Sequence, residues 1–237
     1  MGRAICLKLA SEGADIVVNY SRRQQGAEET AAAARKHGVK AVAMRADVSQ
    51  DREARRLVAD TVAQLGRLDI LVNNAGWSQF TPHRQLDALT EELLDRTWAV
   101  NVKGPIYVTR AAVPEMLKQG GGRVINITSI SAENGAGSSI VYAASKAALL
   151  SITKSLARAF ARENVFVNAI APGLVDTGFV EWPAGTVQKI TAASPMGRIP
   201  TVEDVANAAL FLAVDATGVT AQSIFVDCGL TALGPSS

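Results

Sequence analysis

Short apolar runs along this chain alternate with segments in which apolar positions recur at helical spacing. Several runs are almost continuously apolar, which is typical of strands buried on both faces of a sheet. The predicted strands are Asp15–Tyr20, Lys40–Arg45, Leu68–Asn73, Arg123–Thr128, Val165–Ile170 and Ser223–Val226. Strands that alternate with helices predict βαβ units, and therefore an α/β fold built on a parallel sheet.

Helix signals fill the segments between these strands. Ser49–Leu65 opens with a serine cap and acidic residues. Thr90–Lys118 is long, and its Pro114 should kink or close it. Tyr142–Arg162 is rich in helix-forming residues, and Thr201–Val214 begins with the capping-box pattern TVED. These elements follow one another without a repeat or a linker, which predicts a single domain.

One long segment, Val175–Pro200, carries neither pattern and contains three glycines and three prolines. It follows a predicted strand at the carboxyl edge of the sheet, where ligands of open α/β sheets bind. A long loop at that edge predicts a lid, with an irregular surface excursion as the alternative. Its Phe179 and Trp182, together with Trp77, indicate either an apolar substrate wall or aromatic core packing.

Composition narrows the function classes. The 237 residues are 48% hydrophobic, enough for one core over residues 1–237, and the net charge of +2 gives no basic field for nucleic acid or membrane binding. Cys6 and Cys228 share no spacing motif and are predicted as free thiols of a cytoplasmic protein. His37 and His83 lack metal-ligand spacing, so no metal site is expected.

The candidate chemistry centres on three residues. Tyr142 and Lys146 are four apart at the head of a predicted helix, so both project from one face. A lysine ammonium beside the tyrosine should lower the phenol pKa from about 10 and make the pair a general acid/base. Ser129 ends the buried run RVINITS and should face Tyr142 across a substrate, where its hydroxyl could bind a carbonyl oxygen.

Four motifs in register resemble the short-chain dehydrogenase/reductase family along essentially the whole chain. They are NNAG at Asn73–Gly76, Asn101 within NVKG, Ser129 followed by Tyr142-x-x-x-Lys146, and VNAIAPGLVDT at Val167–Thr177. The resemblance implies a Rossmann-like, doubly wound parallel sheet and hydride transfer between a nicotinamide cofactor and a carbonyl or secondary alcohol. It also implies a homodimer or homotetramer in which the long helices pair across a dyad.

The resemblance further assigns roles to individual residues. Tyr142 would exchange the proton, Lys146 would bind the nicotinamide ribose, Ser129 would orient the carbonyl, and Asn101 would hold a water of a proton relay. The cofactor-binding residues would be Gly2, Asp47, Val48, Asn74, Ala75, Gly76, Tyr142, Lys146, Pro172, Gly173, Val175 and Thr177. Asp47 would contact the adenine, with a strand-end turn as its alternative role, and for Asn101 the alternative is an amide bridging helix backbone.

The cofactor preference is predicted from the end of the first strand. Members of the family that prefer NAD usually carry a carboxylate there, whereas this chain has Asn19-Tyr20-Ser21-Arg22. Arg22 could bind a 2′-phosphate, which favours NADP over NAD. The alternative is that Arg22 and Arg23 only solvate the following helix.

The beginning of the chain departs from the family. Met1–Ala10 is predicted as an amphipathic helix, whereas the family opens with a strand and a TGxxxGxG turn, of which only Gly2 remains. Either the gene product starts further upstream, or this is a truncated form. For the chain as given we expect weak NADP binding or none, and a sheet without its usual first strand, so that Asp15–Tyr20 and Leu68–Asn73 are joined directly or separated by a gap.

The sequence therefore predicts an oxidoreductase that uses NADP(H), with a 3-oxoacyl group or a small ketone as the candidate substrate. Reductases of the family that act on carrier-protein substrates typically carry arginines where this chain has Gly121 and Glu163. This difference argues against a carrier-protein substrate without excluding it. The alternative function is a catalytically impaired, dinucleotide-fold binding or scaffold subunit.

Overall fold

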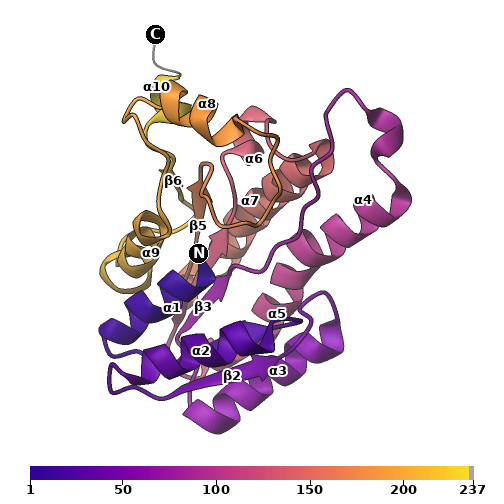
Figure 1. Cartoon of the computed structure of the whole chain (residues 1–237). Coiled ribbons are helices and arrows are strands. Elements are labelled where there is room, and N and C mark those ends of the chain that lie inside the picture. The colour runs from indigo at the N-terminus through magenta and orange to yellow at the C-terminus, as the bar shows by residue number, and fades with distance from the viewer. Residues whose placement is uncertain (235–237) are drawn as a thin grey trace.

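Parallel strands form the centre of the computed structural model, which describes residues 1–234 (Figure 1). Each strand pair in these residues is parallel, as expected for strands joined by crossover helices. The strands are β1 Ile16–Tyr20, β2 Ala41–Arg45, β3 Ile70–Asn73, β4 Gly122–Ile127, β5 Val165–Pro172 and β6 Ser223–Val226. All six predicted strands are therefore present, with ends shifted by one or two residues.

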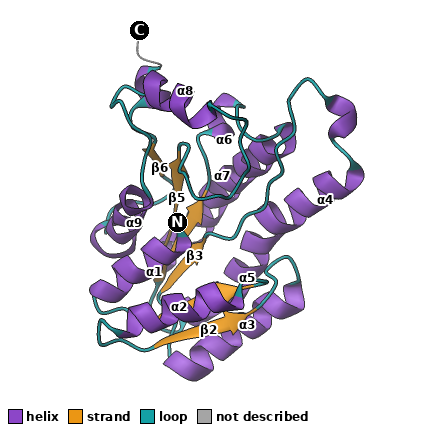
Figure 2. Ribbon diagram, in the orientation of Figure 1, coloured by secondary structure: helices purple, strands orange, loops and turns teal. Residues whose placement is uncertain are grey.

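Helices cover both faces of these strands (Figure 2). One core cluster joins α1, α2 and α9 to one face, and a second joins α3, α5 and α7 to the other. The helices are α1 Gly2–Ser11, α2 Gln24–Arg35, α3 Asp51–Leu65, α4 Glu91–Trp98, α5 Gly104–Leu117, α6 Ser131–Asn134, α7 Ile140–Phe160, α8 Thr186–Ala193, α9 Val202–Leu210 and α10 Leu230–Leu233. The predicted α/β architecture with a doubly wound sheet is thus confirmed.

The strands do not form one continuous sheet. Strands β1 and β2 pair with each other, while β3, β4, β5 and β6 form a separate sheet in that order. Among residues 1–234, no strand pairs with the second edge of β1 or of β3. Val17 and Val18 of β1 and Leu71 and Val72 of β3 are only half-buried, unlike the fully buried centre of β5. Of the two arrangements expected for these strands, the structure has the gap.

Three helix predictions need correction, and one of them is Thr201–Val214, in which α9 ends at Leu210 and a π-helical turn follows at Phe211–Asp215. The segment predicted as one helix, Thr90–Lys118, is divided by a π-helical turn at Ala99–Lys103, so that α4 ends and α5 begins there. Ser49 does not cap α3, because its amide and hydroxyl both donate hydrogen bonds to Asp47 Oδ1. The capping box at Thr201 is present as predicted, with hydrogen bonds in both directions to Asp204.

A buried polar network ties the carboxyl edge of the sheet to the helices. Asn73 Nδ2 donates to Asn126 Oδ1 on β4 at 2.8 Å and to Thr109 Oγ1 on α5 at 3.2 Å. Asn126 Nδ2 in turn donates to Thr153 Oγ1 on α7 at 2.9 Å. These bonds hold α5, β3, β4 and α7 in one arrangement, because breaking any of them would leave a buried amide or hydroxyl group unpaired.

Within residues 1–234, none of the helices has the length and apolar character needed to cross a membrane. The same residues contain no group of three or more His, Cys, Asp or Glu side chains that could hold a metal ion.

Candidate active site

Tyr142 and Lys146 occupy the first turns of α7, which begins at a serine cap. The Ser139 hydroxyl accepts a hydrogen bond from the Tyr142 amide at 3.2 Å. Lys146 Nζ lies 5.7 Å from the centre of the Tyr142 ring, on the same side of the helix. Lys146 is buried, and its Nζ donates a hydrogen bond of 2.7 Å to the Ile127 carbonyl. Helix α7 and strand β4 therefore hold the predicted acid/base pair together.

Ser129 lies just beyond the end of β4 and faces Tyr142. The Ser129 hydroxyl is close enough to the Tyr142 phenol to act on its pKa. Ser129 Oγ also lies 3.0 Å from Ser131 Oγ and accepts a hydrogen bond from the Ser131 amide at 3.1 Å. The Ser129 hydroxyl is therefore fixed in position beside the phenol, as the strand-end placement predicts.

Burial dominates the ionisation of both members of the pair. It raises the pKa of Tyr142 to about 12, against a smaller lowering effect of the hydrogen bond from Ser129. It lowers the pKa of Lys146 to about 8. The expectation that Lys146 brings the pKa of Tyr142 below its ordinary value is therefore wrong in direction for this structure. Removal from water disfavours the phenolate and the ammonium alike, and here it outweighs their mutual attraction.

Asn101 lies in the π-helical turn and is fully buried. Its Oδ1 accepts a hydrogen bond from the Trp77 amide at 2.8 Å, and its Nδ2 donates to the Trp77 carbonyl at 2.9 Å and to Ser145 Oγ at 3.0 Å. The Asn101 amide thus bridges the backbone after β3 to helix α7. This geometry matches the alternative role, an amide that bridges backbone, and the water relay stays a prediction.

Gly76 leaves space where three side chains of the candidate site meet, those of Asn101, Lys146 and Phe179. A Cβ at Gly76 would lie 3.7 Å from each of Asn101 Oδ1, Lys146 Nζ and Phe179 Cζ. At Gly2 the approach is closer, because a Cβ would lie 2.8 Å from Asn74 Nδ2. Asn74 Oδ1 is buried and has no hydrogen-bond partner within residues 1–234. An unpaired buried oxygen beside open backbone is the arrangement expected of a site that binds a polar ligand.

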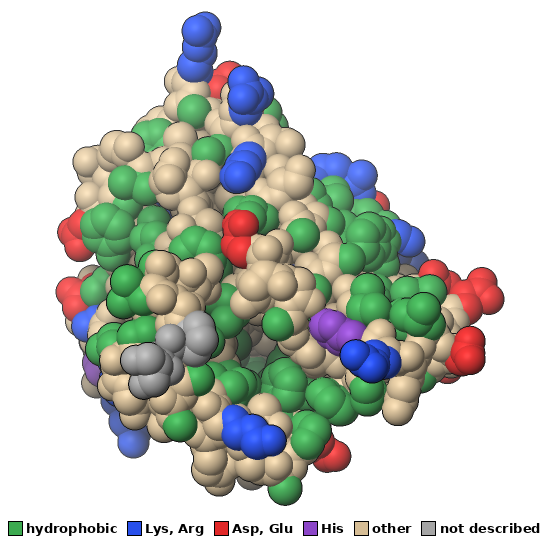
Figure 3. Space-filling view, turned by 90° about the horizontal axis from the view of Figure 1, so that it is seen from above, with side chains coloured by type: hydrophobic (Ala, Val, Ile, Leu, Met, Phe, Trp, Pro, Cys, Tyr) green, Lys and Arg blue, Asp and Glu red, His purple; other side chains and the backbone are tan. Residues whose placement is uncertain are grey.

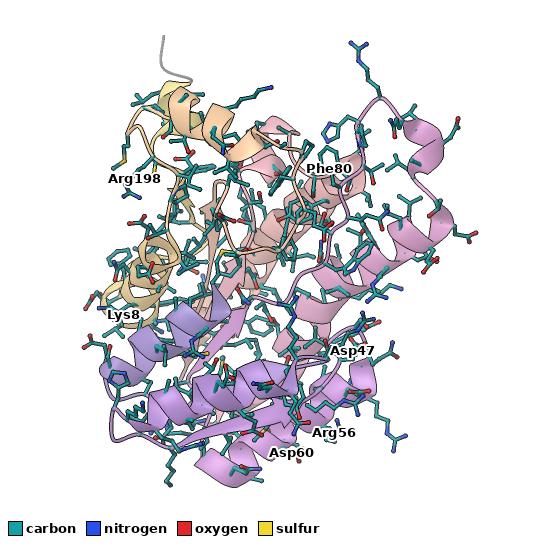
Figure 4. The ribbon with its side chains drawn as sticks, in the orientation of Figure 1. Lys8, Asp47, Arg56, Asp60, Phe80 and Arg198 are labelled. Atoms are coloured by element: carbon teal, nitrogen blue, oxygen red, sulfur yellow. The ribbon has the colours of Figure 1, made fainter. Side chains whose placement is uncertain are left out.

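Ser129, Tyr142 and Lys146 form the candidate catalytic group. A cavity of about 330 Å³ opens beside Ser129 and Tyr142 of this group. It is lined by Ser129 and Tyr142 and by Phe179 and Trp182 of the predicted lid. The space-filling view shows this hollow with hydrophobic side chains around it (Figure 3). Phe80 contacts the lid, since its ring packs edge-on against Trp182 with ring centres 5.9 Å apart (Figure 4). The cavity therefore combines an apolar wall from the lid with polar side chains, among them Ser129, Tyr142 and Asp176.

Comparison with known proteins places this site in a family. The family model described as enoyl-(acyl carrier protein) reductase matches residues 1–231. A protein of Streptomyces violaceoruber, assigned as ketoacyl reductase 2 of the granaticin polyketide synthase, is 40% identical over 97% of this chain and 91% of its own. The chain belongs to the short-chain dehydrogenase/reductase family.

Two solved structures agree with that membership. A Burkholderia xenovorans protein assigned as a short-chain dehydrogenase/reductase superposes with a TM-score of 0.90 and 32% identity, over 97% of this chain and 93% of its own. A gluconate 5-dehydrogenase of Burkholderia cenocepacia J2315, in complex with NADP and tartrate, has a TM-score of 0.88 and 32% identity, over 96% and 89%. As a member of this family, the chain is an NAD(P)-dependent oxidoreductase.

Asp47, Val48 and Asn74–Gly76 are the residues predicted for the adenosine side of the cofactor in this short-chain dehydrogenase/reductase. Asp47 and Val48 do not line the cavity, whereas Gly76 lies beside Lys146. Asp47 Oδ1 accepts hydrogen bonds from the amide and hydroxyl of Ser49, which is the strand-end turn weighed as its alternative role. Val48 packs close to Gly104, where an added Cβ would lie 3.2 Å from Val48 Cγ2. Arg22 follows β1, is exposed, and forms no ion pair with any residue from 1 to 234. Their contacts with a cofactor stay predictions.

The residues predicted for the nicotinamide end are closer to the catalytic group. The cavity is lined by Pro172, Gly173, Val175 and Thr177. The Gly173 amide donates to the Val226 carbonyl at 2.9 Å, and a Cβ at Gly173 would lie 3.1 Å from Asp227 Cβ, so the chain passes close to β6 before the lid begins. Ala75 is exposed beside Gly76.

Some lining residues of this dehydrogenase/reductase were not predicted. The unpredicted polar ones are Thr128, Ser131, Asn134, Ser138 and Asp176, and the unpredicted apolar ones include Ile130, Val187 and Ile190. Ser131 could have been inferred from its spacing of two from Ser129 at a strand end. Val187 and Ile190 lie on helix α8 within the lid, and no sequence pattern predicted that they line the site. Trp77 does not line the cavity; its backbone binds Asn101, and the Arg96 guanidinium lies 5.2 Å from the centre of its ring.

Proposed function

We propose that this chain transfers a hydride between NADP(H) and a carbonyl or secondary-alcohol substrate, with Tyr142 exchanging the proton. The observation that carries the proposal is the meeting of Ser129, Tyr142 and Lys146 at one end of an apolar cavity. Carbonyl reduction requires a proton donor, a hydrogen-bond donor to the carbonyl oxygen and a nearby cation, and these three groups meet here.

The proton chemistry follows from the surroundings of Tyr142. A pKa of about 12 keeps its hydroxyl protonated at neutral pH, so the proton is present for donation to a carbonyl oxygen. The Ser129 hydroxyl is held where it can donate to the same oxygen. As the proton leaves, the nearby Lys146 ammonium stabilises the phenolate that remains. In alcohol oxidation the same groups would accept the proton instead.

The residues present fit a nicotinamide cofactor. The unpaired Asn74 oxygen and the space beside Gly76 lie next to the catalytic group, and Lys146 borders that space. When bound, the cofactor supplies or accepts the hydride. Arg22 supports NADP, because it is an exposed cation at the end of a strand that carries no carboxylate there. The gluconate 5-dehydrogenase that resembles this chain contains NADP, which agrees with this preference.

The cavity also favours a class of substrate. Its lining includes the apolar side chains of Phe179, Trp182, Val187 and Ile190, and among the described residues that line it Asp176 is charged whereas none is Lys or Arg. A ketone or 3-oxoacyl group with an apolar body would bury that body against these side chains. The Streptomyces violaceoruber relative is named a ketoacyl reductase, in line with such a substrate.

Substitution of Tyr142 by phenylalanine tests the proposal. Tyr142→Phe should lower the rate of carbonyl reduction by roughly 10²–10⁴-fold, because the proton donor is lost while the ring is kept. Cofactor affinity should change little. Tyr107→Phe on α5 is the matched control, since Tyr107 packs beside Arg110 rather than in the cavity. NADPH consumption with a panel of ketones and 3-oxoacyl thioesters gives the rate.

Undiminished reduction by Tyr142→Phe would contradict the assigned mechanism. Cofactor binding without reduction of any carbonyl in the panel would instead favour the alternative, a binding or scaffold subunit of the same fold.

A homodimer or homotetramer is the second part of the proposal. Leu94 and Trp98 of α4 and Ile140 of α7 are exposed apolar side chains around a shallow hollow, and Ile106 and Leu117 of α5 are exposed as well. Pairing of these helices between copies would cover these apolar side chains.

Trp98→Glu should shift the mass measured by light scattering at micromolar concentration toward the monomer. A monomeric unsubstituted protein would contradict the proposal.

A further inference from the structure

Phe179 carries its ring from the lid to the catalytic group. The preceding residue, Gly178, has φ +63°, a left-handed conformation that side chains disfavour. The Phe179 ring centre lies 6.3 Å from that of Tyr142, and the two planes are inclined by 52°. Its Cζ atom is 3.7 Å from the point where a Cβ on Gly76 would lie, and Lys146 Nζ is equally far from that point.

The space beside Gly76 is therefore bordered both by residues of the candidate catalytic site and by the lid. On one side it is bordered by Asn101 and Lys146, and on the other by the tip of the Phe179 ring. Under the proposed function, this is where the ribose and nicotinamide of the cofactor must approach Lys146 and Tyr142. A ligand entering from the Gly76 side would collide with the ring in the position it holds here.

The ring can also leave this position without disrupting a packed core. Phe179 is 43% exposed, whereas the catalytic Lys146 behind it is 4% exposed. The neighbouring aromatic pair, Phe80 and Trp182, holds another part of the lid and does not include Phe179. A ring that is anchored on one side only and follows a glycine has two accessible arrangements, over the catalytic group or turned away from it.

We propose that Phe179 is a gate residue: its ring closes over Tyr142 and Lys146 and must turn out when the cofactor enters beside Gly76. The inference rests on the proposed function for the identity of the entering ligand. Cofactor binding is then weakened by the fraction of molecules in which the gate is closed. Contacts of one aromatic pair correspond to about a two- to tenfold effect on such an equilibrium.

The first test needs no cofactor. Phenolate absorbance is titrated in the unsubstituted protein and in Phe179→Ala, each compared with its Tyr142→Phe counterpart to isolate Tyr142 from Tyr20 and Tyr107. Removing the ring admits water to the phenol, so the pKa of Tyr142 should fall from about 12 toward its ordinary value of 10. Phe211→Ala is the matched control, because Phe211 is 42% exposed and lies outside the cavity.

The second test measures NADPH affinity by fluorescence titration. Phe179→Ala should bind NADPH about two- to tenfold more tightly than the unsubstituted protein, and Phe211→Ala should not differ from it. Unchanged or weaker binding by Phe179→Ala overturns the gate, as does an unchanged pKa of Tyr142. If no variant binds NADPH, the displacement step is refuted for this chain, whatever the phenolate titration shows. Binding with the expected order but no carbonyl reduction would refute the proposed reaction and leave the gate supported.

Discussion

Lys146 shows how far single residues can be predicted from spacing. The four-residue interval from Tyr142 and the strand end at Ser129 were enough to place these three side chains together. The directions of their pKa shifts were not predictable, because burial depends on β4 and on the lid, which are distant in the sequence. For the same reason the place of Phe179 could not be predicted, since it depends on the backbone angle at Gly178.

The buried ammonium of Lys146 makes the stability of the protein depend on pH. In the folded protein the pKa of Lys146 is about 8, below the ordinary value of 10.5, so between these values the folded state loses a proton that the unfolded state keeps. The free energy of unfolding should therefore rise with pH in this window. Between pH 7 and pH 9.5 the unsubstituted protein should gain about 2 kcal/mol relative to Lys146→Met, measured by urea unfolding.

Lys154→Met is the control for this measurement, because Lys154 is exposed on the same helix. Its stability should follow that of the unsubstituted protein at every pH. A difference between the unsubstituted protein and Lys146→Met that stays constant from pH 7 to pH 9.5 would contradict a buried ammonium at this position.

At the scale of elements, the π-helical turn Ala99–Lys103 was not predictable from the pattern of apolar residues. The apolar positions of Thr90–Lys118 fit one continuous helix, and one wider turn changes their spacing only slightly. The turn nevertheless places Asn101 against the backbone of Trp77. The cap at Thr201 was predicted correctly, whereas the cap predicted at Ser49 is absent because the Ser49 hydroxyl binds the neighbouring Asp47 carboxylate instead.

Removal of the Asn101 amide should destabilise the protein substantially. Asn101→Ala leaves the buried N–H and C=O of Trp77 without their partners, and each such group costs about 1–3 kcal/mol. The free energy of unfolding in urea should therefore fall by about 2–5 kcal/mol. Asn207→Ala on α9 is the control, since Asn207 is exposed in a helix. Equal effects of the two substitutions would show that the Asn101 bridge contributes nothing.

For the whole molecule, the sequence was sufficient to predict the strands and their parallel direction. Whether β1 and β3 would join or stay apart could not be decided, because the outcome depends on helix packing. Helix α1 packs against both α2 and α9, and α3 packs against α5. These contacts connect the two sheets across the gap, while no strand pairing does so within residues 1–234.

The divided sheet has a consequence for cooperativity. In a continuous sheet, strand pairing couples every element to its neighbours, so that small domains usually unfold in one step. Here no strand pairing within residues 1–234 joins the two-stranded unit to the four-stranded one, and side-chain packing connects them instead, which should let the two-stranded unit unfold at lower denaturant. Trp77, Trp98 and Trp182 all follow β3, so their fluorescence reports on the four-stranded unit. Far-ultraviolet circular dichroism, which detects both units, should begin to change at lower urea than tryptophan fluorescence, and coincident transitions would show that side-chain packing alone makes the molecule a single cooperative unit.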